Sequence, residues 1–113
     1  MKIYHNPKCS KSRQTLAIVE EETSAFEIVE YLKNPLSAKE ITVLLSQLNI
    51  KPIELVRTQE TIWKENYKGK ELTEIEIINA MAENPKLIER PIVVKNNKAV
   101  IGRPPENVLS FFA

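Results

Sequence analysis

Cys9 is the only cysteine of the chain and its strongest candidate nucleophile. It lies between a short β-prone segment that ends at His5 and a polar segment of helical character that begins near Lys11. Free amide groups at a helix N-terminus stabilise a thiolate over a thiol, and the cationic Lys8, Lys11 and Arg13 lie nearby in the sequence. A buried structural cysteine is the alternative interpretation. The charged neighbours favour nucleophilic or redox chemistry instead.

The number of soft ligands limits what this cysteine can do. A single thiol cannot form an intramolecular disulfide, so redox chemistry at Cys9 needs a second thiol from another molecule. His5 is the only histidine, and one cysteine with one histidine does not match the usual zinc sites. We therefore expect no metal. For His5 itself, we favour an electrostatic influence on Cys9 over a purely structural hydrogen bond.

Three arginines stand at the ends of expected elements rather than in runs of charge. Arg57 follows a short apolar segment, Arg90 precedes Pro91 at the expected start of a strand, and Arg103 follows Gly102 at the end of another. A planar guanidinium matches an oxyanion through two parallel hydrogen bonds. Each arginine taken singly is more typical of a solvated surface group. The Arg90–Pro91 bond can be cis or trans on sequence grounds.

The overall composition is that of one globular domain, which we expect to span residues 1–113. A net charge of +1 creates no global field that would attract nucleic acid or an anionic membrane, so we expect neither as a partner. Residues 1–19 contain lysines and an arginine and no uninterrupted apolar stretch. This pattern predicts a protein without a secretion signal and with a cytoplasmic location.

Two helices carry clear start signals in the sequence. Ser37 with Glu40, and Thr73 with Glu76, have the spacing of capping boxes. The apolar positions of the first of these helices follow a helical period, and they are Ile41, Leu44, Leu45 and Leu48. On the second helix, Ile75, Ile78 and Ala82 lie along one face. An earlier helix over 11–22 has only a thin apolar stripe, and we expect Ser10 or Ser12 to cap it.

The remaining segments complete a recognisable order of elements. The expected strands are 2–5, 26–29, 92–94 and 99–101, with short helical turns over 50–71 and a last short helix over 108–112. Asn96 and Asn97 predict a tight hairpin turn with positive φ between the last two strands. A βαβ unit, a helical insertion and a ββα unit follow one another. We therefore predict an α/β protein of thioredoxin-like fold, with a small mixed sheet flanked by helices.

Three separated segments resemble the signatures of one family. Residues 3–13, IYHNPKCSKSR, are similar to the active-site segment of the glutaredoxin-dependent arsenate reductases. Residues 87–94, LIERPIVV, and 102–106, GRPPE, resemble the second and third signatures of that ArsC-like family, which is related to the Spx-type proteins. Arg57 falls where the family has its first anion-binding arginine. The resemblance covers essentially the whole chain.

The resemblance implies an arsenate reductase that serves arsenical resistance. Cys9 would attack arsenate and form a thiolate–arsenic adduct, glutathione would act as co-substrate, and glutaredoxin would complete the reduction to arsenite. No bound cofactor is implied, and we expect a monomer. The remaining implied roles are oxyanion binding for Arg57, Arg90 and Arg103, ionisation of Cys9 for His5, a cis proline at Pro91, and structural support at the site for Ser10 and Ser12.

Other functions fit parts of the pattern. A general glutathione-dependent thiol oxidoreductase would use the same thiolate, but disulfide exchange has no need for three arginines. An Spx-like regulator that binds RNA polymerase would often carry a Cys-x-x-Cys switch, and here the second position is Ser12. A phosphatase loop of the form C-x5-R would need an arginine at Thr15. These comparisons favour the reductase.

Overall fold

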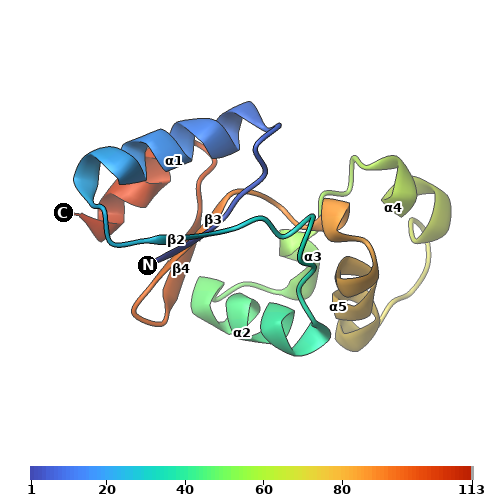
Figure 1. Cartoon of the computed structure of the whole chain (residues 1–113). Helices are drawn as coiled ribbons and strands as arrows, with labels where there is room; N and C mark the ends of the chain where they lie inside the picture. The colour runs from blue at the N-terminus through green and yellow to red at the C-terminus, as the bar shows by residue number, and fades with distance from the viewer. Residues whose placement is uncertain (113) are drawn as a thin grey trace. The chain divides into compact units, whose positions relative to one another are not determined.

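The computed structural model describes residues 1–112, which divide into two compact units (Figure 1). Residues 1–34 and the chain from Arg90 onward form the sheet unit, and residues 35–89 form the helical unit. The helical unit is thus an insertion between two parts of the sheet unit. That residues 1–113 act as one domain stays a prediction.

The sheet unit contains the four strands and two helices. Its elements are β1 (Lys2–Tyr4), α1 (Ser10–Glu22), β2 (Glu27–Val29), β3 (Ile92–Lys95), β4 (Lys98–Ile101) and the 3-10 helix η2 (Pro105–Phe111). The strand order is β2-β1-β3-β4. β1 pairs in parallel with β2 and antiparallel with β3, and β3 pairs antiparallel with β4. The sheet is therefore mixed, because a crossover helix joins β1 to β2 whereas a hairpin joins β3 to β4.

A small apolar core joins one face of this sheet to the two helices. Ile3 and Val93 are direct partners on neighbouring strands, and both are fully buried. They belong to one cluster with Val19 of α1 and Val108 of η2. α1 and η2 pack against each other, and Figure 1 shows them side by side along the sheet. Burial of these apolar side chains is what holds α1, and hence its N-terminus, against β1.

The hairpin between β3 and β4 follows the expectation from sequence. Asn96 and Asn97 have φ values of 50° and 65°. Asparagine tolerates this left-handed region better than most residues, and two such residues produce the twist that a two-residue hairpin needs. The turn fixes the register in which Ile92 faces Ile101. The last helix is present as expected, as a 3-10 helix that begins at Pro105.

The helical unit confirms both capping boxes. Its elements are α2 (Ala38–Leu48), α3 (Pro52–Leu55), α4 (Thr61–Asn66), α5 (Glu74–Glu83) and the 3-10 helix η1 (Pro85–Leu87). In α2 the Ser37 hydroxyl accepts from the Glu40 amide, and the Glu40 carboxylate accepts from the Ser37 amide. Thr73 and Glu76 make the same pair of bonds in α5. The short α3 and α4 are the helical turns expected over 50–71.

The buried face of α5 is not the face that carries Ile75. Ile77, Ala80 and Met81 are buried, whereas Ile75 is 70% exposed. Both stripes of α5 are apolar, so periodicity alone does not select between them. The packing of α5 against α2, α3 and η1 makes the selection. Ile75, Ile78 and Ala82 do share one face of α5, but on that face Ile78 and Ala82 are only half-buried and Ile75 is exposed.

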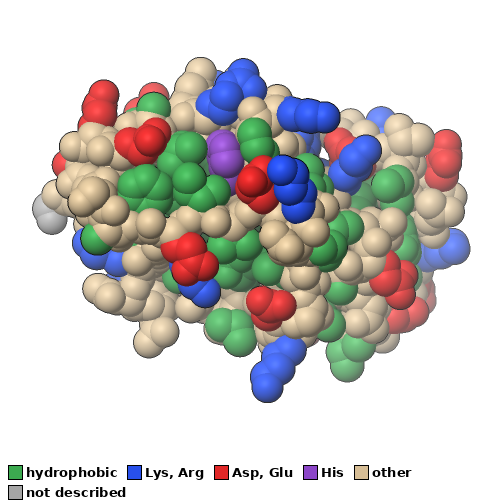
Figure 2. Space-filling model, viewed as in Figure 1, with side chains coloured by type: hydrophobic (Ala, Val, Ile, Leu, Met, Phe, Trp, Pro, Cys, Tyr) green, Lys and Arg blue, Asp and Glu red, His purple; other side chains and the backbone are tan. Residues whose placement is uncertain are grey.

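The fold class is confirmed: a small mixed sheet is flanked by helices, with helices inserted between the βαβ and ββα parts, as in thioredoxin-like proteins. The surface view in Figure 2 shows acidic and basic side chains interspersed, consistent with a net charge of +1. Within residues 1–112, no helix combines the length and the apolar character needed to cross a membrane.

Replacement of Ser37 by alanine tests the capping box of α2. We expect the free energy of unfolding to fall by about 1 kcal/mol, because the Glu40 amide loses its acceptor at the helix start. Urea denaturation measures the change. Ser46→Ala is the matched control on the same helix, since the exposed Ser46 hydroxyl donates only to the nearby Val43 carbonyl. Equal destabilisation by the two variants would contradict this account of the cap.

Candidate active site

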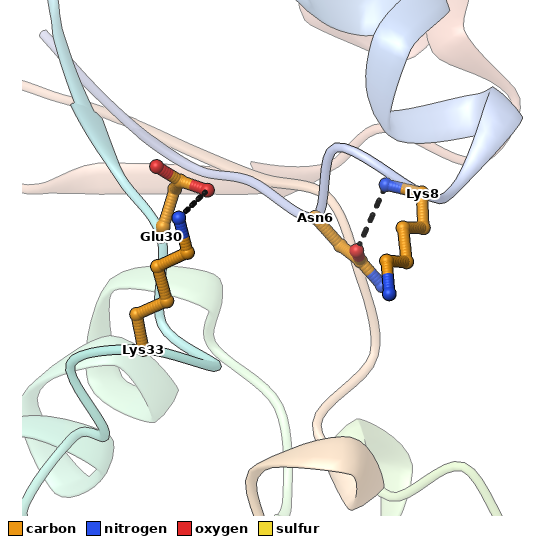
Figure 3. A network of polar contacts seen from close by, with 4 residues as sticks. All are labelled: Asn6, Lys8, Glu30 and Lys33. Atoms are coloured by element: carbon orange, nitrogen blue, oxygen red, sulfur yellow. Dashed lines mark hydrogen bonds and ion pairs between the residues drawn. The ribbon is translucent and has the colours of Figure 1, made fainter.

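A tight loop joins β1 to α1 and sets the position of Cys9. The Asn6 side-chain oxygen accepts a hydrogen bond from the Lys8 amide at 3.0 Å (Figure 3). The Cys9 amide donates to the Asn6 carbonyl at 3.0 Å. The Pro7 carbonyl accepts from the Arg13 guanidinium at 2.9 Å, which ties the loop to the first turn of α1. The loop backbone is thus bonded at successive residues, so it holds Cys9 in one place.

Cys9 is itself the N-cap residue of α1. Its backbone is extended, with φ −95° and ψ 123°, and helical geometry begins at Ser10. No side-chain capping bond is made at this helix start within residues 1–112. The prediction that Ser10 or Ser12 caps the helix is therefore wrong. Because no oxygen caps the first turn, its amide donors are available to the sulfur.

The Ser12 hydroxyl takes a different partner. It lies 2.6 Å from Nδ1 of His5 and accepts from the Asn6 amide at 3.0 Å. All three residues are buried, and Ser12 has no exposed surface. A hydrogen bond that satisfies a buried polar group is expensive to remove. This network therefore fastens the first turn of α1 to the end of β1.

The surroundings of Cys9 favour its thiolate. Burial raises the pKa of the thiol, but hydrogen bonds from the Ser12 amide, the Arg90 guanidinium and the Lys11 amide lower it more, so the net pKa lies below the ordinary value. The positive charge of Arg90 acts in the same direction. The lowering thus comes from helix amides and Arg90, rather than from the Lys8, Lys11 and Arg13 side chains that the sequence suggested.

The surroundings of His5 disfavour its charged form. Burial lowers its pKa, the carboxylate of Glu30 raises it, and the charge of Arg13 lowers it again, with a net pKa below the ordinary value. Glu30 is also paired with Lys33, with its carboxylate oxygen 3.7 Å from the Lys33 ammonium nitrogen (Figure 3). His5 is not among the groups that shift the Cys9 pKa. The observed contact of His5 is its bond to Ser12, and an influence on Cys9 ionisation stays a prediction.

The start of β3 and the end of β4 also meet in the sheet unit. The Arg90–Pro91 peptide bond is cis, as the family resemblance implied, and the Arg103–Pro104 bond is cis as well. The Gly102 amide donates to the Pro91 carbonyl at 2.8 Å. Arg90 donates a hydrogen bond to Cys9. Through the neighbouring Pro91 it is connected to Gly102, the residue that precedes Arg103. The Arg103 side chain is exposed.

Thr15 is a residue near this site that the sequence analysis did not select. It has no exposed surface, and its hydroxyl donates to the Gly102 carbonyl at 3.3 Å. Ser12, Thr15 and Val19 form the buried stripe of α1. The apolar pattern concealed this stripe, because two of its three residues are polar. Their helical spacing was the available signal.

Arg57 belongs to the helical unit. Its amide donates to the Leu87 carbonyl at 2.7 Å, and its guanidinium lies 3.9 Å from Glu60 and 3.8 Å from Glu89. The buried Nη1 atom of Arg57 has no hydrogen-bond partner within residues 1–112. A buried guanidinium nitrogen in this condition is suited to an added anion. That Arg57 acts together with Cys9 stays a prediction.

A groove in the helical unit contains none of the predicted site residues. It has a volume of about 590 Å³ and is lined by residues of α2, α3, α5 and the segment between α2 and α3, which include Leu45, Lys51 and Ile78. Residues 1–112 also contain no cluster of three His, Cys, Asp or Glu side chains that could hold a metal ion.

Comparison with known proteins points to one family. The model of the ArsC family matches residues 4–111. "Uncharacterized protein YfgD" of Escherichia coli is 50% identical over 111 residues, which are 96% of this chain and 93% of that protein. An arsenate reductase of Haemophilus influenzae is 42% identical over 109 residues, covering 95% and 94% of the two chains. The structure of an arsenate reductase from Vibrio cholerae superimposes with a TM-score of 0.91 at 46% identity, and the match covers 97% of each chain.

The origin of the low Cys9 pKa can be tested by substitution. Arg90→Gln removes a hydrogen bond and a charge that favour the thiolate, so the thiol pKa rises. The pH midpoint of Cys9 alkylation by iodoacetamide then moves to higher pH. Lys8→Gln is the control, because Lys8 is exposed and its side chain is not among the groups that lower the Cys9 pKa. An equal shift in both variants would contradict the assignment to Arg90.

Proposed function

Because the chain belongs to the ArsC family, we propose that it is an arsenate reductase that converts arsenate to arsenite through a Cys9 thiolate–arsenic adduct. The observation that carries this proposal is the set of hydrogen bonds to the Cys9 sulfur. The Ser12 and Lys11 amides and the Arg90 guanidinium favour the thiolate that the reaction needs. The same donors suit an oxyanion that approaches the sulfur.

The proposed reaction balances with two external thiols. The Cys9 thiolate forms a sulfur–arsenic bond, and one arsenate oxygen leaves as water after protonation. Glutathione then adds to arsenic and expels a second water. A glutaredoxin thiolate attacks the glutathione sulfur, and the electrons of the breaking sulfur–arsenic bond reduce As(V) to As(III). Water finally displaces Cys9, so arsenite leaves and the thiolate returns.

Three guanidinium groups are proposed to bind the oxyanion. Arg90 is supported by its bond to Cys9, since a group that touches the nucleophile is placed to touch its target. Arg103 is supported by the short backbone connection from Pro91 to Gly102. Arg57 is supported by its buried Nη1 atom, which lies 3.9 Å from the Glu60 carboxylate, too far for a strong hydrogen bond. Such donors stabilise charge where it develops in the reaction.

The reductants must come from outside the chain, because Cys9 is its only thiol. Glutathione as co-substrate and glutaredoxin as partner supply the two thiols that the electron count requires. Both act in a reducing compartment, which agrees with a cytoplasmic location. We propose a monomer that binds no further cofactor.

A general glutathione-dependent thiol oxidoreductase is the second candidate. The partly exposed Cys9 and its low pKa favour it, because thiol–disulfide exchange needs an accessible thiolate. This reaction makes no use of an oxyanion. The two candidates therefore differ in whether arsenate is consumed.

A coupled assay tests the proposed function. We expect arsenate-dependent oxidation of NADPH in the presence of glutathione, glutathione reductase and glutaredoxin, and no turnover by Cys9→Ser, which lacks the nucleophile. Replacing glutaredoxin with thioredoxin and its reductase identifies the electron donor. If the folded protein reacts with glutathione disulfide but turns over no arsenate, the reductase proposal fails and the general oxidoreductase replaces it.

Arg103→Gln tests the oxyanion site apart from the thiol. Loss of one charge-assisted hydrogen bond should raise the KM for arsenate by about 10- to 100-fold. The rate of Cys9 reaction with glutathione disulfide should stay within about twofold, since Arg103 is not among the groups that set the thiol pKa. Lys98→Gln is the control, because Lys98 is an exposed cation at the start of β4, the strand that precedes Arg103, and we assign it no role in the site. An unchanged KM in Arg103→Gln would remove Arg103 from the site.

A further inference from the structure

Two of the three buried residues of α1 are polar. Ser12 and Thr15 have no exposed surface, and both lie on the helix that presents Cys9. The Ser12 hydroxyl bonds His5 and Asn6, which follow β1 and begin the loop that leads to Cys9. Thr15 bonds a segment that is 87 residues away in the sequence. If a buried hydroxyl only filled space, an apolar group of the same shape would make the folded protein more stable. Hydroxyls at these two positions therefore suggest that their hydrogen bonds have a role.

The partner of Thr15 is the peptide that leads into Arg103. The Thr15 hydroxyl donates to the Gly102 carbonyl at 3.3 Å, while the Gly102 amide donates to the Pro91 carbonyl at 2.8 Å. Gly102 is thus held from both sides, by α1 and by the start of β3. The oxygen that Thr15 holds belongs to the peptide group that bonds Gly102 to Arg103.

The fit around Gly102 is too close for any side chain. A Cβ atom at this position would lie 2.6 Å from the Thr15 hydroxyl oxygen and 2.9 Å from Cγ of Pro91. The absence of a side chain lets the Gly102 backbone reach the Thr15 hydroxyl. Thr15, Gly102 and Pro91 therefore form one packed unit, and the direction of the Gly102–Arg103 peptide depends on it.

We propose that Thr15 is a positioning residue for oxyanion binding, which sets the Gly102–Arg103 backbone relative to the helix that carries Cys9. This inference rests on the proposed function, in which Arg103 binds the arsenate oxygens. The helix α1 then holds the nucleophile at its N-cap, and Thr15, about 1.7 turns later, holds the segment that carries Arg103. A binding group that is displaced by even a small distance loses much of its effect.

Thr15→Val tests the inference, because it removes the hydroxyl and keeps the shape. We expect the KM for arsenate to rise about fivefold with a smaller change in kcat, as for loss of one hydrogen bond. The pH midpoint of Cys9 alkylation should not move, since the groups that set the thiol pKa are untouched. Thr15→Ser should restore the KM of the wild type.

Two further comparisons separate positioning from stability. Thr42→Val is the matched control, since the Thr42 hydroxyl also donates to a backbone carbonyl, on an exposed face of α2. Its KM for arsenate should equal that of the wild type. If Thr15→Val does not fold, Thr15→Ser and Thr15→Ala replace it, because they differ only in the hydroxyl. A higher KM in the alanine variant supports the inference.

The outcomes distinguish failure of the positioning role of Thr15 from failure of the proposed function. If the wild type reduces arsenate and Thr15→Val has the same KM for arsenate, the positioning role is overturned and the proposed function remains. Where Thr15→Val does not fold, equal KM values in Thr15→Ser and Thr15→Ala lead to the same conclusion. If the wild type shows neither arsenate turnover nor arsenate binding by isothermal titration calorimetry, the proposed function fails and the positioning role fails with it. A changed KM without rescue by Thr15→Ser also overturns the role assigned to the hydroxyl.

Discussion

The first turn of α1 presents Cys9 at a helix start that no side chain caps, in surroundings that lower the pKa of the thiol, and the neighbouring contacts of the sheet unit keep this helix start in place. The Ser12 and Lys11 amides and the Arg90 guanidinium all donate to Cys9. A hydroxyl or carboxylate cap would compete for those amides. Ser12 turns its own hydroxyl away, toward His5 and Asn6. The helix start therefore remains open for the thiolate and for an incoming anion.

Features that depend on neighbours in the sequence were predictable. The capping boxes at Ser37 and Thr73 join residues three positions apart, and the Asn96–Asn97 turn depends on the backbone preference of asparagine itself. The place of Cys9 after a strand and before a helix followed in the same way. Its partner Arg90 was predicted as an anion ligand from a motif, whereas its bond to the sulfur required the fold.

Features that depend on distant partners were not predictable from one sequence. Ser12 was expected to act as a helix cap, but tertiary structure offered its hydroxyl a ring nitrogen and a loop amide. Thr15 and Gly102 meet only because β4 ends beside α1, and their separation along the chain is 87 residues. The buried face of α5 was not predictable because α5 has two apolar stripes, and only the packing of its neighbours selects Ile77 over Ile75.

The central claim is that the Cys9 thiolate attacks an oxyanion of arsenic, and protection of Cys9 from alkylation tests it most directly. The wild-type protein is treated with iodoacetamide at increasing arsenate concentration, with sulfate as the anion control, and modified Cys9 is counted by intact mass. The account predicts that arsenate slows alkylation in a saturable manner and that sulfate, which forms no sulfur adduct, slows it less. An alkylation rate that is independent of arsenate, or equal protection by both anions, would contradict covalent attack by Cys9.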